Sequence, residues 1–86
     1  MKVRIPTPLR SYTGNEASVT AEGETLTEVL ADLDRRFPGI RFRMVDEQGR
    51  LREHMMIFLG RERCRDLSTR LDGIDEVAIM QALSGG

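Results

Sequence analysis

The sequence predicts an α+β protein in which one helix packs across one face of a mixed β-sheet. Two observations carry this prediction. Apolar and polar residues alternate in "KVRIP" and "EASVTAE" near the start, and strand-like apolar segments return in "HMMIFLG" and "EVAIMQAL". Between them, "TLTEVLADLDRRF" repeats its apolar residues at helical spacing. A hairpin, one helix and further strands are typical of this fold class, and 86 residues form a single small core.

The alternating residues near the start of the chain predict two strands that form a hairpin. Val3 and Ile5 fall on one face of the first strand, which is therefore half-buried. Pro6 ends the strand because it cannot donate a ladder hydrogen bond. Residues 7–15 predict a loop with a tight turn at its end, "TGN", and residues 16–22 predict the second strand.

The helix has the clearest boundaries of any predicted element. In "TLTE", the Thr25 hydroxyl can accept a hydrogen bond from the Glu28 amide while the Glu28 side chain reaches back, which is a capping box. Pro38 and Gly39 end the helix. The apolar stripe between these limits consists of Leu26, Val29, Leu30, Leu33 and Phe37.

The second half of the chain predicts three further strands. Residues 40–44 stay ambiguous, because "IRFRM" fits an extended segment or a second short helix. Residues 54–60 predict a strand that is apolar on both faces, so it lies centrally or its outer face is used. A short strand is expected around 63–65 and the last strand at 76–83. The first and last strands are apolar enough to lie side by side in the middle of the sheet.

Composition excludes several classes of partner and location. The net charge is −1, from 13 basic and 14 acidic residues, so we expect neither nucleic acid nor a membrane as a partner. The single cysteine, Cys64, excludes an internal disulfide and fits a reducing cytosol. No segment has the length and apolar character of a signal peptide or a membrane span. We therefore expect a soluble cytoplasmic protein.

The sequence offers few candidates for catalysis or metal binding. Cys64 and His54, the only histidine, could form a nucleophile pair, but packing of the cysteine and surface exposure of the histidine are the better readings. His54 has no companions at metal-ligand spacing, so we expect no metal and no catalytic residue. A run of arginines could form a nucleic-acid patch with Phe42, although a solvated face or a match to an acidic partner fits the net charge better. This run comprises Arg35, Arg36, Arg41, Arg43, Arg50 and Arg52.

Three features of the chain resemble the ubiquitin-like sulfur carriers of the MoaD/ThiS family, which have the β-grasp fold. They are "MIFLG" at 56–60, the closing "VAIMQALSGG" at 77–86, and the order of hairpin and helix before them. The segments "IPTPLRSYTG", "SVTAEGETL" and "FPGI" resemble more specifically the carriers of cysteine biosynthesis in actinobacteria. The resemblance implies a β-grasp domain over residues 1–83, with four to five strands and one main helix, followed by a flexible Gly-Gly tail at 84–86.

The same resemblance implies a carrier that is not an enzyme and binds no cofactor itself. A MoeB/ThiF-type activating enzyme would use ATP to adenylate the carboxylate of Gly86, with Gly85 as its spacer. A sulfur donor would then form a thiocarboxylate, which delivers sulfide to a sulfur-acceptor biosynthetic enzyme for cysteine or a related metabolite. Whether a metalloprotease trims a longer precursor stays open.

A docking surface outside the tail is also expected. Ordering a backbone residue costs about 1–2 kcal/mol, so binding must draw on another surface, on the order of 800 Å² per partner. The sheet face opposite the helix is the candidate, but the alternation does not tell which set of side chains faces outward. The predicted partner-binding residues are Met56, Ile57, Phe58, Leu59, Met80, Leu83 and Ser84.

Two alternatives remain at this point. The chain could be a protein modifier that is joined to lysines through Gly86, and both this role and the carrier role need the same activation. Lys2 is its only lysine, which disfavours branched polymers but not single attachment. The chain could also be a plain β-grasp interaction module.

Overall fold

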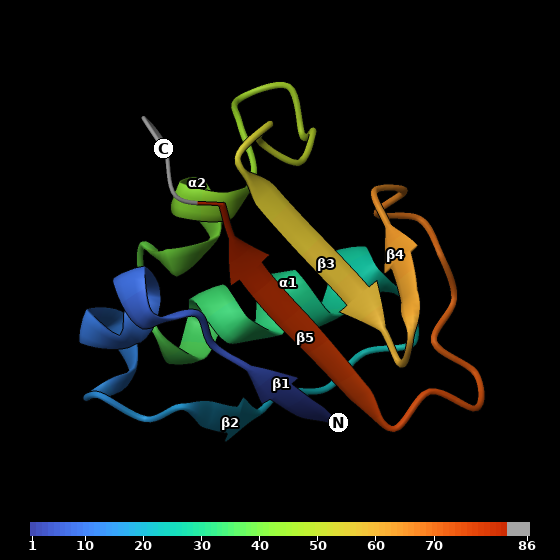
Figure 1. Cartoon of the computed structure of the whole chain (residues 1–86), viewed down its shortest axis with the longest axis horizontal. Helices are drawn as coiled ribbons and strands as arrows, with labels where there is room; N and C mark the ends of the chain where they lie inside the picture. Colours follow the sequence, from blue (N-terminus) through green and yellow to red (C-terminus); the bar gives the residue numbers. More distant parts are fainter. Residues whose placement is uncertain (83–86) are drawn as a thin grey trace.

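The computed structural model describes residues 1–82, which form a five-stranded sheet with the main helix across one face (Figure 1). The strand order across the sheet is β2-β1-β5-β3-β4. The strands are β1 (Lys2–Arg4), β2 (Ser18–Thr20), β3 (Met55–Leu59), β4 (Glu62–Cys64) and β5 (Glu76–Gln81). The helices are the 3₁₀ helix η1 (Thr7–Thr13), the main helix α1 (Leu26–Arg36) and the short helix α2 (Ile40–Met44).

The central pair of strands joins the two halves of the sequence. β1 and β5 run parallel, with Val3 opposite Val77, while β1–β2, β3–β5 and β3–β4 are antiparallel. The prediction that the first and last strands lie side by side is confirmed, and so is the mixed sheet with one main helix. β5 is the middle strand of the sheet and is hydrogen-bonded on both sides.

Helix α1 begins where the capping box predicted it. The Thr25 hydroxyl accepts a hydrogen bond from the Glu28 amide at 3.2 Å. The return contact differs from the expected box, because Oε1 of Glu28 accepts from the Glu24 amide at 2.9 Å rather than from Thr25. Two backbone amides at the start of the helix are therefore satisfied by side chains.

The core lies between α1 and the inner face of the sheet. The apolar stripe of α1 is buried except for Phe37, which is half-buried at its C-terminal end. Gly23 precedes this helix and allows a close approach, because a Cβ there would lie 2.6 Å from the amide nitrogen of Val29. The principal core side chains are Val3, Ile5, Leu26, Val29, Leu30, Leu33, Ile40, Met44, Met55, Ile57, Val77 and Ile79.

Two segments differ from the prediction or resolve its ambiguity. Residues 7–13, expected as a loop, form η1, and the turn after it is confirmed by the positive φ of Gly14 and Asn15. Residues 40–44 form a helix rather than a strand. Its start is fixed by Asp34, whose Oδ1 accepts hydrogen bonds from the amides of Gly39 and Arg41 at 3.1 and 3.0 Å.

The edge strands are shorter than, or shifted from, the predicted ones. β2 covers only three of the seven residues expected at 16–22, and β4 begins at Glu62 rather than Arg63. β5 ends at Gln81 within the predicted span 76–83. Short, charged or polar edge strands are usual, because they limit pairing with other chains.

Candidate functional site

The end of β5 is the first part of the site. Gln81 pairs with Met55 of β3, and the Ala82 amide donates to the carbonyl of His54 at 2.8 Å. The backbone is therefore held by the sheet through Ala82. The predicted site residues Leu83, Ser84, Gly85 and Gly86, and the predicted domain boundary between 83 and 84, lie outside the described residues.

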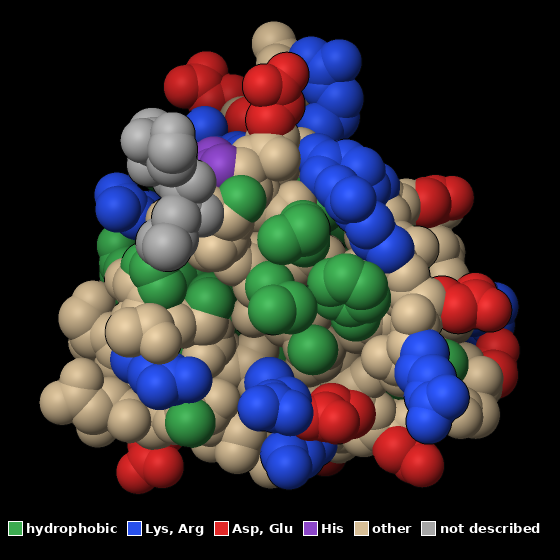
Figure 2. Space-filling view, in the orientation of Figure 1, with side chains coloured by type: hydrophobic (Ala, Val, Ile, Leu, Met, Phe, Trp, Pro, Cys, Tyr) green, Lys and Arg blue, Asp and Glu red, His purple; other side chains and the backbone are tan. Residues whose placement is uncertain are grey.

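An apolar surface covers the sheet face opposite α1. Met56 lies opposite Met80, and Phe58 lies opposite Ala78, so all four side chains point to the same face. Met80 is 48% exposed, and the other three are half-buried. We call these four residues the outer-face patch. Figure 2 shows hydrophobic side chains gathered over β3 and β5, with Lys and Arg side chains around them.

The prediction was wrong for two residues of β3. Ile57 and Leu59 are buried, with 0% and 8% exposure, and belong to the core. The register places Ile57 opposite Ile79 and therefore on the inner face with it, whereas the neighbours of Ile57 along β3 point outward. Ala78 was not among the predicted partner-binding residues. Its alternation with Ile79 is visible in the sequence, but it does not tell which of the two side chains faces outward.

Basic side chains flank the outer-face patch on two strands. Arg4 of β1 lies opposite Ala78, and Arg63 of β4 lies opposite Phe58. Glu76, at the start of β5, is an acidic residue beside Arg4, and its Oε1 lies 3.6 Å from Nε of Arg4. The patch therefore offers a partner an apolar centre with basic side chains at its rim.

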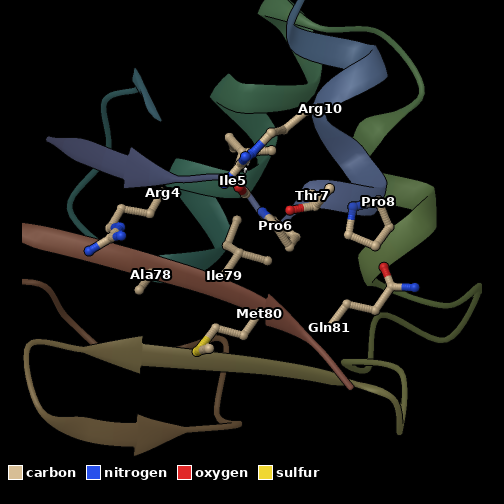
Figure 3. Close-up of a pocket in the computed structure, with 10 residues that line it drawn as sticks. All are labelled: Arg4, Ile5, Pro6, Thr7, Pro8, Arg10, Ala78, Ile79, Met80 and Gln81. Carbon is tan, nitrogen blue, oxygen red and sulfur yellow. Dashed lines mark hydrogen bonds between the residues drawn. The ribbon is translucent and has the colours of Figure 1, made fainter. Parts of the chain in front are cut away.

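A groove adjoins the patch where β5 approaches its end. It measures about 430 Å³ and lies between β5 and the segment that joins β1 to η1. Figure 3 shows Pro6 and Pro8 on one side of this groove and Met80 and Gln81 on the other. Arg10 is held nearby, because its Nε donates to the Ile5 carbonyl at 3.0 Å.

A second hollow, of about 320 Å³, shares Gln81 with this groove. Its other lining residues are Phe42, Arg43, Arg52 and His54. We call it the exit hollow, because it lies beside the point where the described chain ends. The end of β5 is thus flanked by two recesses, both of which contain arginines.

The remaining candidates of the sequence analysis do not assemble into a reactive centre. The Cys64 thiol is half-buried on β4 and lies 3.3 Å from both the Asp66 carbonyl oxygen and Oγ1 of Thr69. His54 is exposed just before β3. Within residues 1–82, no three His, Cys, Asp or Glu side chains are grouped as a metal site requires.

The perturbed carboxyl groups stabilise local structure. The pKa of Asp32 is held well below its usual range, chiefly by the hydrogen bond from the Glu22 amide and then by those from Arg36 and Arg35. Asp46 has a lowered pKa because the Arg50 amide donates to it. Neither carboxyl group belongs to the outer-face patch, and both accept hydrogen bonds from backbone amides of neighbouring segments.

The mixed sheet, the helix across its inner face and the outer-face patch beside the end of the last strand define a β-grasp protein of the ubiquitin-like class. The ThiS family model matches residues 3–86, and the chain belongs to this family. In the part of the chain that the structure describes, no helix is long and apolar enough to cross a membrane.

Several known proteins are similar to this chain in sequence and structure over nearly its whole length. The sulfur carrier protein CysO of Mycobacterium tuberculosis (strain ATCC 25618 / H37Rv) is 38% identical, over 98% of this chain and 96% of its own. A chain in the crystal structure of the Amycolatopsis orientalis BexX/CysO complex is 35% identical with a TM-score of 0.90, and the match covers 99% and 98% of the two chains. The small archaeal modifier protein 1 of Methanosarcina acetivorans is 26% identical, with a TM-score of 0.79 over 99% and 94%.

The family and these relatives determine the general function. The chain is a sulfur carrier protein rather than an enzyme, as its sequence predicted. The candidate site combines the outer-face patch with the end of the strand that leads to the C-terminal residues.

Proposed function

We propose that the carboxylate of Gly86 carries the sulfur as a thiocarboxylate. The observation that supports this is the position of β5: it is paired on both sides, is held through Ala82, and is followed in sequence by Leu-Ser-Gly-Gly. A rigid strand thereby fixes the starting point of a short segment whose last two residues have no side chains. Such a segment suits insertion into a narrow site in another protein.

The chemistry needs two successive substitutions, the first at the α-phosphorus of ATP and the second at the carboxyl carbon of Gly86. A carboxylate oxygen of Gly86 attacks the α-phosphate of ATP, and pyrophosphate leaves. Sulfide then attacks the carbonyl carbon of the resulting acyl adenylate, AMP leaves with the bonding electrons, and a thiocarboxylate remains. The adenylate converts a poor leaving group into a good one, as covalent catalysis does generally. ATP belongs to a MoeB/ThiF-type activating enzyme in this proposal, and the carrier itself binds no cofactor.

The outer-face patch supplies the affinity that the C-terminal segment lacks. Ordering four residues costs several kcal/mol, at about 1–2 kcal/mol each. The exposed thioether of Met80 and its neighbour Met56 form an adaptable apolar surface, which suits successive partners of different shape. A matching partner surface has an apolar centre and acidic side chains opposite Arg4 and Arg63.

Two partners follow from this cycle. The activating enzyme loads Gly86, and a sulfur-acceptor enzyme for cysteine or a related metabolite unloads it. The BexX/CysO complex supports a stable contact between a carrier of this type and another protein. We place the cycle in the cytoplasm, where ATP is available and where a lone thiol such as Cys64 stays reduced.

Deleting Gly86 tests the proposal directly. The protein is incubated with the cognate activating enzyme, ATP and a sulfide source, and its intact mass is then measured. Wild type is expected to gain the mass difference between sulfur and oxygen. The deletion variant is expected not to load, while its thermal unfolding midpoint stays unchanged because the sheet is complete at Gln81.

The matched control for this deletion is Asp75→Asn, which changes an exposed residue before β5 and keeps the length of the C-terminal segment and its terminal carboxylate. It should load like wild type. A deletion variant that still loads, or a wild type that never gains sulfur, would refute the proposal.

Protein modification is the second candidate, because the Methanosarcina acetivorans relative is a modifier protein by name. The two functions share activation and differ in the nucleophile that attacks the adenylate, which is a lysine amine in the modifier. Covalent adducts on other proteins after activation would favour modification. Mass spectrometry after trypsin digestion would find them as lysines that carry residues 71–86, because Arg70 is the last Lys or Arg of the chain. Sulfur exchange without adducts favours the carrier.

A further inference from the structure

The exit hollow contains a surface feature that the outer-face patch does not explain. Phe42 lies on α2 between two buried residues, Ile40 and Met44, yet its own side chain is 56% exposed. The centre of the Arg52 guanidinium lies 4.7 Å from the centroid of the Phe42 ring, which is a cation–π distance. An aromatic ring and an arginine thus form a stacked pair on the surface.

Arg52 is fixed in place by four hydrogen bonds, one of which its carbonyl accepts from the Met55 amide at 3.0 Å. Its amide donates to the Met44 carbonyl at 2.9 Å, and its own carbonyl accepts from Nη2 of Arg65 at 3.1 Å. Its Nε donates to the Phe42 carbonyl at 2.9 Å. These contacts tie the backbone and the base of the guanidinium to α2, so the group is pre-oriented before any partner binds.

The outer edge of this guanidinium has no partner in residues 1–82. No hydrogen bond or ion pair of the described contacts uses Nη1 or Nη2 of Arg52, and no Asp or Glu lines the exit hollow. Asp46 lies close enough for Arg52 to lower its pKa slightly, but its Oδ1 accepts from the amides of Gln48 and Arg50. Arg52 therefore presents two parallel N–H donors, the geometry that a carboxylate fits bidentately.

The place of the pair limits which protein can reach it. Gln81 lines the exit hollow, and Gly86 is four residues after Ala82 in the sequence. Four extended residues span at most about 14 Å. An enzyme that receives Gly86 in its active site must therefore lie against the end of β5, within reach of Phe42 and Arg52.

We propose that the Phe42–Arg52 pair is a second docking point for the activating enzyme and binds an Asp or Glu side chain there. This inference rests on the proposed function of Gly86. A net charge of −1 disfavours a nucleic acid as the occupant, because polyanions need a basic surface of larger extent. The carboxylate binds the free edge of the guanidinium, which is itself stacked on the Phe42 ring, and Arg43 adds a positive charge at the edge of the hollow.

Binding of the cognate activating enzyme to Arg52→Gln tests the inference. We expect affinity to fall about tenfold, as for removal of one moderate hot spot, and to depend less on salt than in wild type. Arg52→Lys should lose most of the same affinity, because an ammonium group lacks the planar fork. Phe42→Ala, which leaves the backbone contact of Arg52 intact, should weaken binding less. Thermal unfolding of each variant shows whether it is folded at the temperature of the assay.

Arg61→Gln is the matched control, because it removes the same charge from an exposed residue at the other end of β3. If Arg52→Gln and Arg61→Gln bind equally well while wild type binds and loads, the inference is wrong and the proposed function stands. If wild type neither binds nor loads, both are wrong. If only Arg52→Gln loses affinity, and saturating enzyme still loads it at Gly86, the second docking point is established.

Discussion

The two faces of the paired strands β3 and β5 are both apolar at their centre but differ in what covers them. Met55, Ile57 and Leu59 face α1 and are at most 8% exposed. Met56 and Phe58, which alternate with them, lie with Met80 on the opposite face, and no element of residues 1–82 covers that face. The inner face holds the molecule together, while the outer face is available to a second protein.

This difference shows that apolar character alone does not separate core from interface. What separates them is the strand register, which brings Ile57 against Ile79 and Met56 against Met80. Substitutions of neighbouring residues on one strand should therefore have opposite effects, on stability in one case and on binding in the other.

The largest expected effect is that of Ile57→Ala on the inner face. Removing a fully buried branched side chain leaves a cavity beside α1 and should lower the free energy of unfolding by about 2–5 kcal/mol. Urea denaturation measures this change. The neighbouring Met56→Ala should cost about 1 kcal/mol or less, because Met56 is only half-buried. Equal losses in the two variants would remove the distinction between the faces.

A smaller effect is expected from Met80→Ala on the outer face. With 48% of Met80 exposed, the free energy of unfolding should change by about 0.5 kcal/mol. Affinity for the activating enzyme should fall roughly five- to tenfold, because Met80 is the most exposed residue of the outer-face patch. Calorimetric titration gives the affinity. Unchanged binding in the double variant Met56→Ala, Met80→Ala would mean that partners do not use this surface.

The smallest effect is expected from Asp32→Asn in α1, which should change how the stability of the protein depends on pH in the acid range. Asp32 links α1 to the Glu22 amide, and its folded pKa is lowered, so the folded state binds fewer protons than the unfolded chain. Its stabilisation is present at neutral pH and is lost as the pH falls below about 4, where an unfolded aspartate titrates. Asp32→Asn should therefore be less stable than wild type at pH 7.

Melting curves between pH 7 and pH 2 check this expectation. The melting temperature of Asp32→Asn should fall less on acidification than that of wild type. Asp75→Asn is the control, since Asp75 is exposed and has no hydrogen bond or ion pair within residues 1–82. A variant Asp32→Asn whose acid sensitivity equals that of wild type would show that another carboxyl group governs this pH range.

Much of the fold was predictable because local signals agreed with the packing. The capping threonine and the apolar stripe of α1 act within a dozen residues, so their pattern is complete in the sequence. Residues 40–44 were ambiguous for a physical reason. Ile40 and Met44 are four apart and share a helical face, yet Ile40, Phe42 and Met44 also fit a strand. Hydrogen bonds that the amides of Gly39 and Arg41 donate to Asp34, in another helix, decided the outcome.

The candidate site was predictable only in part. The sequence located the surface on β3 and β5, but it could not orient these strands, because both sets of alternating residues are apolar. Both sets were therefore counted as partner-binding residues, although Ile57 and Leu59 belong to the core. The role of Arg52 had no local signal, since its contacts with Phe42 and Arg65 span ten and thirteen residues of sequence.

The parallel pairing of β1 with β5 has a mechanical consequence. Val3 lies opposite Val77, and the two strands point in the same direction, so the start of β1 and the end of β5 are at opposite ends of the sheet. Tension between these ends shears the ladder and loads its hydrogen bonds together instead of opening them one at a time.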